Sequence, residues 1–212
     1  MNFNIGEKIR DKLLSKISKK IYWNLRAINF DKEWSGHQSK YFDQHIALKN
    51  IVKDIKPNNI LDVGCGFGRN IKFLIEECNV RPCNITAIDF SINMIQKAKS
   101  FLGDNFYKLR EIKEASILDI PYSDNGFDMV LVHGVMMHID FNDISRAISE
   151  VLRVSNGYIV QVEEYYKDKV GAKINNFTYC HDYFNLYANK DIIDLDMYNK
   201  NLIMLVINKS CE

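Results

Sequence analysis

Three glycines at alternating positions, Gly64, Gly66 and Gly68, are the residues in this sequence best suited to surround a ligand. A short apolar run, Ile60–Val63, precedes them, and an apolar stretch with helical spacing, Ile71–Cys78, follows. This order predicts a strand, a tight turn and a helix. Glycine leaves no Cβ in the way of a ligand, and the first turn of a helix directs unpaired N–H groups into the same space. The pattern indicates a nucleotide-type crevice at the carboxyl end of a first strand.

An acidic residue at the end of a second apolar run strengthens this interpretation. The run Ile85–Asp89 ends in a carboxylate, near the separation of roughly 20 residues that is typical of nucleotide-binding units. A carboxylate in this position can accept both hydroxyls of a ribose. Taken alone, the glycines are also compatible with a tight turn that binds nothing. A nicotinamide-binding turn is disfavoured because Arg69 breaks its usual glycine spacing.

The composition sets further bounds. The chain has 212 residues, of which 47% are hydrophobic and 26% charged, so one domain with a substantial core is expected. The net charge of +1 gives no strong field toward nucleic acid. No apolar run approaches the roughly 18 residues of a membrane span, and no signal peptide is evident, so a cytoplasmic protein is expected. The five cysteines form no Cys-x-x-Cys pair and no cluster has metal-ligand spacing, so neither disulfides nor a metal site is expected.

The elements that must position the glycine turn alternate along the chain, which predicts an α/β fold. The expected strands are 60–63, 84–90, 107–112, 127–133, 158–162, 192–198 and 202–208. The expected helices are 4–25, 43–56, 70–79, 92–102, 144–152 and 181–188. A short link between the last two strands indicates an antiparallel hairpin.

Residues 1–45 are predicted to form a helical cap or lid on a single domain, 1–212. Residues 4–25 combine apolar residues at every fourth position with lysines, which suits a packing helix or, alternatively, a membrane-surface helix. Trp34, His37 and Tyr41 follow in an aromatic segment. Their rings can close over a planar or sulfonium-bearing ligand, or form the apolar underside of the cap.

Four segments taken in order resemble the successive motifs of class I S-adenosylmethionine-dependent methyltransferases. They are Leu-Asp-Val-Gly-Cys-Gly-Phe-Gly-Arg (61–69), Ala-Ile-Asp-Phe-Ser (87–91), Leu-Asp-Ile-Pro-Tyr-Ser-Asp-Asn-Gly-Phe-Asp (118–128) and Val-Leu-Val-His (130–133). The resemblance covers roughly residues 45–162. It implies a Rossmann-like three-layer sandwich with a mostly parallel seven-stranded sheet, an antiparallel C-terminal strand and S-adenosylmethionine as cofactor.

The resemblance also implies roles for individual residues. Asp62 would support the glycine turn or meet the ammonium of the cofactor, Asp89 would accept the ribose hydroxyls, and Phe90 would pack on adenine. Ser116 stands where many relatives hold the adenine amino group with an acid, which is a departure from the family pattern. The cofactor-binding residues expected are Asp62, Gly64, Cys65, Gly66, Gly68, Asp89, Phe90, Ser116, Ile117 and His133.

The acceptor side is less defined by the sequence. The catalytic candidates are His133, His138 and His181, each of which could instead be a structural histidine. The candidates for the substrate pocket are Trp34, His37, Tyr41, Glu163 and Tyr183.

The resulting hypothesis is an enzyme, monomeric or homodimeric, that methylates a small-molecule acceptor at oxygen, on a sugar or a phosphate-bearing metabolite. An N-methyltransferase and a non-catalytic cofactor-binding subunit are the alternatives. Nucleic acid is disfavoured as a substrate because the chain lacks a basic groove and a recognition module.

Overall fold

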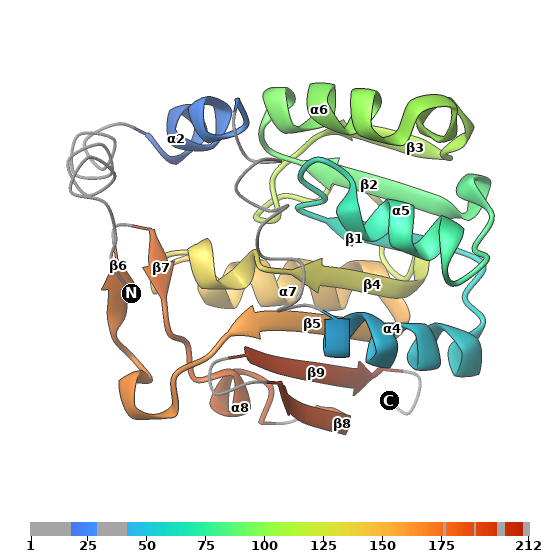
Figure 1. Ribbon diagram of the computed structural model, residues 1–212. Helices are drawn as coiled ribbons and strands as arrows, with labels where there is room; N and C mark the ends of the chain where they lie inside the picture. Colours follow the sequence, from blue (N-terminus) through green and yellow to red (C-terminus); the bar gives the residue numbers. More distant parts are fainter. Residues whose placement is uncertain (1–17, 29–41, 176, 189, 199–201, 210–212) are drawn as a thin grey trace.

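The main sheet of the protein has seven strands. The computed structural model describes residues 18–28, 42–175, 177–188, 190–198 and 202–209. The strands of this sheet are Ile60–Val63 (β1), Ile85–Asp89 (β2), Glu111–Glu114 (β3), Phe127–His133 (β4), Ser155–Glu164 (β5), Asp191–Tyr198 (β8) and Leu202–Asn208 (β9). They lie in the order β3-β2-β1-β4-β5-β9-β8 (Figure 1). The first five are parallel and β9 is antiparallel to both of its neighbours, which confirms the predicted fold.

Helices cover both faces of this sheet. One apolar core joins it to Phe42–Ile55 (α4), Arg69–Glu76 (α5) and Ile92–Leu102 (α6). A second core joins the opposite face to Ile144–Val154 (α7) and Tyr183–Leu186 (α8). Every residue of β1 and β2 is buried, as parallel strands between two helical layers require.

Local sequence signals explain several boundaries. Ser91 caps α6 by accepting a hydrogen bond from the Met94 amide (3.3 Å), as expected for an N-cap serine. The third strand begins later than the predicted residue 107 because residues 103–108 form a 3₁₀ helix. The predicted helix 181–188 is confined to α8, whose N-cap Asp182 accepts from the Asn185 amide. A small hairpin, Lys173–Asn175 (β6) and Thr178–Tyr179 (β7), was not predicted.

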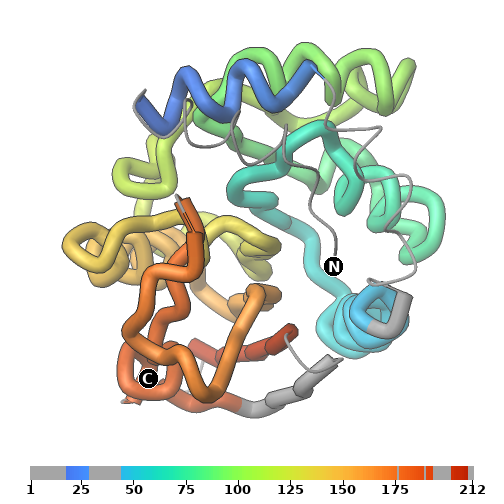
Figure 2. Tube along the Cα trace, turned by 60° about the vertical axis from the view of Figure 1, so that its left-hand side comes forward, coloured from blue at the N-terminus to red at the C-terminus, as the bar shows by residue number. Residues whose placement is uncertain are grey.

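A short helix, Lys19–Arg26 (α2), lies at the carboxyl ends of the parallel strands, beside α6 and near the β6–β7 hairpin (Figures 1 and 2). The Ser91 hydroxyl donates to Asn24 Oδ1 (2.6 Å), and the side-chain Nδ2 of Asn93 donates to the backbone carbonyl of Asn24 (3.0 Å). Lys20 forms an ion pair with Glu114 at the end of β3. These contacts fix α2 across the edge of the sheet where the glycine turn lies.

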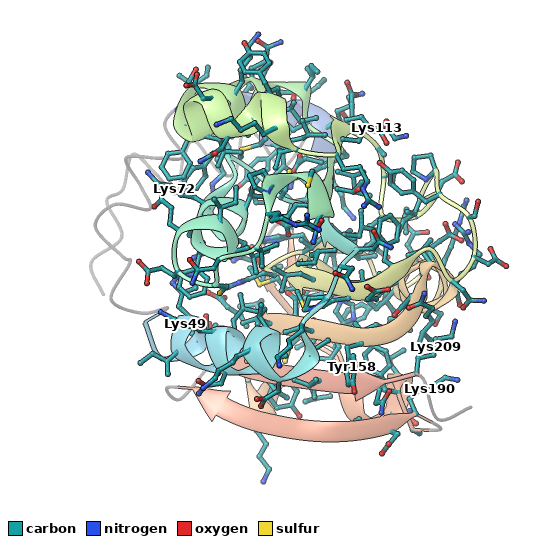
Figure 3. The ribbon with its side chains drawn as sticks, turned by 90° about the vertical axis from the view of Figure 1, so that its right-hand side faces the viewer. Lys49, Lys72, Lys113, Tyr158, Lys190 and Lys209 are labelled. Carbon is teal, nitrogen blue, oxygen red and sulfur yellow. The ribbon has the colours of Figure 1, made fainter. Side chains whose placement is uncertain are left out.

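The opposite end of the sheet is closed by structural contacts. Lys209, labelled in Figure 3, donates to the carbonyl oxygens of Leu152 (2.7 Å) and Ser155 (2.8 Å) and to Asn125 Oδ1 (2.9 Å). Its ammonium thereby satisfies carbonyls at the C-terminal end of α7, which have no partner within the helix. Because Lys209 directly follows β9, these bonds tie the C-terminal end of α7 to that strand.

Candidate active site

The glycine turn between β1 and α5 is tied to β2 by backbone and side-chain hydrogen bonds. The amides of Gly64 (2.8 Å) and Cys65 (3.0 Å) both donate to the Ile88 carbonyl. The Gly66 amide donates to Asp89 Oδ2 (2.9 Å). Hydrogen bonds therefore join the glycine turn directly to Asp89 and to the end of the neighbouring strand.

The three glycines of this turn all have positive φ angles, of 69°, 55° and 89° for Gly64, Gly66 and Gly68. They differ in how much space the surrounding atoms leave for a side chain. A Cβ on Gly64 would lie 2.4 Å from Cγ2 of Val135, and one on Gly68 would lie 3.0 Å from Cδ1 of Leu102. A Cβ on Gly66 would meet no atom within 4 Å. Gly64 and Gly68 are thus needed for packing, whereas Gly66 faces open space in which a ligand can approach the backbone.

Asp89 combines a structural role with spare acceptor capacity. Its second oxygen, Oδ1, accepts from the Ser91 amide (2.8 Å), and the side chain is 7% exposed. Burial raises the pKa of Asp89 to about 6, against the effect of its two amide donors, Ser91 and Gly66. Each carboxylate oxygen has a further lone pair, so the expected bonds to ribose hydroxyls are chemically available. Phe90, next in the chain, is partly exposed beside it.

Asp62 is a buried carboxylate that accepts no hydrogen bond from the described residues. The side chain is 0% exposed, and neither oxygen has a hydrogen-bond partner among the described residues. Burial raises its pKa to about 7, while the Arg69 guanidinium acts in the opposite direction. The Asn70 amide also lowers this pKa but does not reach hydrogen-bonding geometry. An ionised carboxylate in such a place requires a cation, which fits the ammonium group of the expected cofactor.

Arg69, the first residue of α5, contacts His133 at the end of β4. Its Nη2 lies 3.2 Å from Nδ1 and 3.1 Å from Nε2 of the imidazole. Burial and the guanidinium charge hold the pKa of His133 well below its usual range, so the ring is neutral. Arg69 was not among the predicted site residues. Its position directly after the third glycine was the available signal.

The segment after β3 holds the residues expected near adenine. Ser116 Oγ accepts from the Leu118 amide (3.1 Å) within a local turn, and Ile117 is buried in the core on the α7 side of the sheet. The serine hydroxyl can still donate one hydrogen bond and accept another. Its acceptor strength is lower than that of a carboxylate.

His138 lies in a 3₁₀ turn after β4 and contacts α2. Its Nδ1 is 2.6 Å from the Phe177 carbonyl, so Nδ1 carries the proton and Nε2 is the acceptor. The Trp23 ring of α2 meets the imidazole edge-on, with centroids 4.8 Å apart. Burial lowers the pKa of His138 to about 4, which keeps the ring neutral.

The other predicted acceptor-side residues are placed differently. His181 is buried, and its Nε2 contacts the Ile139 carbonyl (3.0 Å). Glu163 is 1% exposed, and Tyr183 is fully buried with no hydrogen-bond partner for its hydroxyl in the described part of the chain. These three side chains lie within the protein interior. Trp34, His37 and Tyr41 lie outside the described residues, as does most of the predicted cap.

Comparisons with known proteins agree with this geometry. A solved S-adenosylmethionine-dependent methyltransferase from Leishmania major shares the fold, with a TM-score of 0.70 and 15% identity, covering 87% of this chain and 82% of that one. A family model described as a methyltransferase domain matches residues 60–156. Residues 60–156 thus match a methyltransferase domain, within a fold that the chain shares with S-adenosylmethionine-dependent methyltransferases.

Curated relatives of this methyltransferase domain differ in length and in name. A demethylmenaquinone methyltransferase from Bacillus velezensis is 21% identical over 174 residues, which cover 82% of this chain and 72% of that protein. A glycine/sarcosine/dimethylglycine N-methyltransferase from Actinopolyspora halophila is 32% identical over 103 residues, covering 48% of this chain and 17% of that protein. The chain spans less than half the length of this and two other curated relatives.

Two further observations concern what the methyltransferase domain contains. In the described ranges, no group of histidine, cysteine, aspartate or glutamate side chains is arranged to hold a metal ion. Within those same ranges, no helix has the length and apolarity needed to cross a bilayer.

Proposed function

We propose that this protein transfers a methyl group from S-adenosylmethionine to a small-molecule acceptor held beneath α2. The observation that carries the proposal is the course of α2 across the carboxyl end of the sheet. Trp23 contacts His138 and Tyr22 contacts Phe177 (centroids 4.7 Å apart), while Asn24 is bonded to Ser91. A site covered in this way suits a compact acceptor and leaves little room for a polymer.

The cofactor would be held by residues that already have the required chemistry. Asp62 offers the ammonium a carboxylate that accepts no hydrogen bond from the described residues, Asp89 offers lone pairs to the ribose, and Gly66 allows close approach to the backbone. Phe90 and Ile117 supply apolar surface for adenine. When bound, S-adenosylmethionine supplies a methyl carbon that its sulfonium makes electrophilic. Alignment of the acceptor with that carbon can lower the activation barrier by about 7–11 kcal/mol.

His138 is proposed to orient an acceptor hydroxyl. With Nδ1 donating to the Phe177 carbonyl, Nε2 is free to accept the hydroxyl proton in a hydrogen bond. A pKa of about 4 makes this imidazole a weak general base, because efficient bases have pKa values near the working pH. Orientation is therefore its main contribution, and oxygen is the proposed nucleophile.

The test is methyl transfer from labelled S-adenosylmethionine to fractionated metabolites, followed by identification of the labelled product. The expected result is a labelled small hydroxyl compound whose formation falls at least tenfold in His138→Ala while cofactor affinity is retained. A protein that binds the cofactor but labels no acceptor in any fraction would support the non-catalytic subunit instead.

The same screen should include amines and quinones, because several curated relatives have names that indicate such acceptors. Two of them are named N-methyltransferases, and several are named demethylmenaquinone methyltransferases. A labelled amine that is formed equally well by His138→Ala would favour the N-methyltransferase alternative, since an amine with a lone pair needs no acceptor for a hydroxyl proton.

A further inference from the structure

Glu163, near the end of β5, holds the turn that follows β4. Its Oε1 accepts from the amides of Val135 (3.1 Å) and Met136 (2.8 Å), and its Oε2 accepts from the amide of Met137 (3.1 Å). The Gly134 amide extends this attachment by donating to the Val162 carbonyl (2.8 Å). One buried carboxylate therefore satisfies three consecutive N–H groups for which the described part of the chain offers no other acceptor.

The same turn packs directly against the cofactor-binding glycines. The Val135 side chain fills the space beside Gly64 so closely that a Cβ on that glycine would overlap with it. Valine is stiff about χ1, so its position follows its backbone. The backbone of Val135 is in turn fixed by Glu163. At its other end the turn carries His138, next to Met137.

We propose that Glu163 is a positioning residue that sets the spacing between the glycine turn and the turn 135–138, and thereby shapes the cofactor crevice. The carboxylate does not touch the crevice itself; it acts through the amides of residues 135–137 and through Val135 on Gly64. The effect on the acceptor, through His138, rests on the proposed function. The effect on the cofactor does not.

The surroundings of Glu163 make its ionisation state part of this role. Burial raises the pKa of Glu163 to about 8 and the nearby Glu164 charge acts in the same direction, whereas the three amide donors lower it. The phenol groups of Tyr183 and Tyr187 face it from α8 and the residue that follows. Ionisation strengthens all three N–H contacts, because hydrogen bonds to a charged acceptor are about twice as strong as neutral ones.

The decisive comparison is between Glu163→Gln and Glu164→Gln. Glu164 is the adjacent carboxylate on the other side of the strand, and its contact is with the Tyr166 hydroxyl (3.4 Å). The glutamine amide at position 163 would present N–H groups to the Met137 amide, so at least one hydrogen bond is lost. We expect amide exchange at residues 135–137 to become about tenfold faster and S-adenosylhomocysteine to bind about tenfold more weakly, as loss of one such bond implies. At pH 9, where Glu163 is ionised with or without the neighbouring charge, Glu164→Gln should change neither quantity.

Two further readouts separate positioning from general stability. Affinity for S-adenosylhomocysteine should rise between pH 7 and 9 more steeply in the wild type than in Glu163→Gln, because only the wild type gains the ionised carboxylate. Val135→Ala should weaken binding while the amides of residues 136 and 137 stay protected, and it replaces Glu163→Gln if that variant does not fold. Unchanged binding in Val135→Ala, or equal losses in the two glutamine variants, would overturn the proposal. Neither readout needs a methyl acceptor. The role of Glu163 can therefore be refuted or supported independently of whether the proposed methyl transfer is observed.

Discussion

Substituting alanine for Gly64 and for Gly66 should separate the packing requirement of the glycine turn from its binding requirement. Both residues have positive φ, which costs an alanine about 1–2 kcal/mol. Gly64→Ala adds a Cβ 2.4 Å from the stiff Val135 side chain, and overpacking of this kind costs about 1–3 kcal/mol more. The total is about 2–5 kcal/mol for Gly64→Ala and about 1–2 kcal/mol for Gly66→Ala.

The assay is thermal unfolding of the cofactor-free protein together with calorimetric titration of S-adenosylhomocysteine. At about 2–4 °C per kcal/mol for a chain of this size, Gly66→Ala should lower Tm by about 2–8 °C. Gly64→Ala should lower it further, by about 6–12 °C for a central cost of 3 kcal/mol. Binding should respond in the opposite order, with a loss of about tenfold or more in Gly66→Ala because its Cβ would project into the open space proposed for the cofactor. Wild-type affinity in Gly66→Ala, or equal Tm values for the two variants, would refute this reasoning.

Three other outcomes are expected. Burial raises the pKa of Asp62 to about 7, above its value in the unfolded chain. The free energy of unfolding of the cofactor-free protein should therefore fall as the pH rises from about 4 to 7. In urea titrations Asp62→Asn should flatten this pH dependence, and the variant should also bind the cofactor more weakly. His138→Gln should lower kcat without changing cofactor affinity, whereas His181→Gln should mainly lower Tm, because His181 is bonded inside the core. Lys209→Met leaves two carbonyls near the end of α7 without their ammonium donor and should cost about 1–3 kcal/mol in chemical denaturation, with unchanged affinity for the cofactor.

Local patterns predicted the elements that carry the cofactor site. The strand ending in Asp89, the serine cap of α6 and the glycine turn all follow from adjacent residues, and the structure brings the glycines and the acid into direct contact. The β6–β7 hairpin was missed because its strands have three and two residues, too short for a recognisable alternation. It matters for the site, since Phe177 lies between these strands and accepts the hydrogen bond from His138.

The residues expected around the methyl acceptor are positioned by contacts between segments far apart in the sequence. Local sequence patterns do not predict such contacts. Glu163 was expected in the substrate pocket because it follows an apolar strand. Alternation along β5 was the signal to use, because it puts Glu163 on the same buried face as Ile159 and Gln161. The pairing of Val135 with Gly64 joins residues 71 positions apart, and no local pattern indicates it.

The position of β9 has a consequence for how the chain acquires its structure during synthesis. This strand, Leu202–Asn208, hydrogen-bonds to β5 on one side and to β8 on the other, so it is internal to the sheet although it comes last among the described strands. Until it emerges from the ribosome, β5 is an unprotected edge that offers its N–H and C=O groups to other chains. The strand carrying Glu163 is therefore exposed to aggregation in the nascent protein, and truncation before residue 202 should yield a chain that requires chaperones rather than a smaller folded domain.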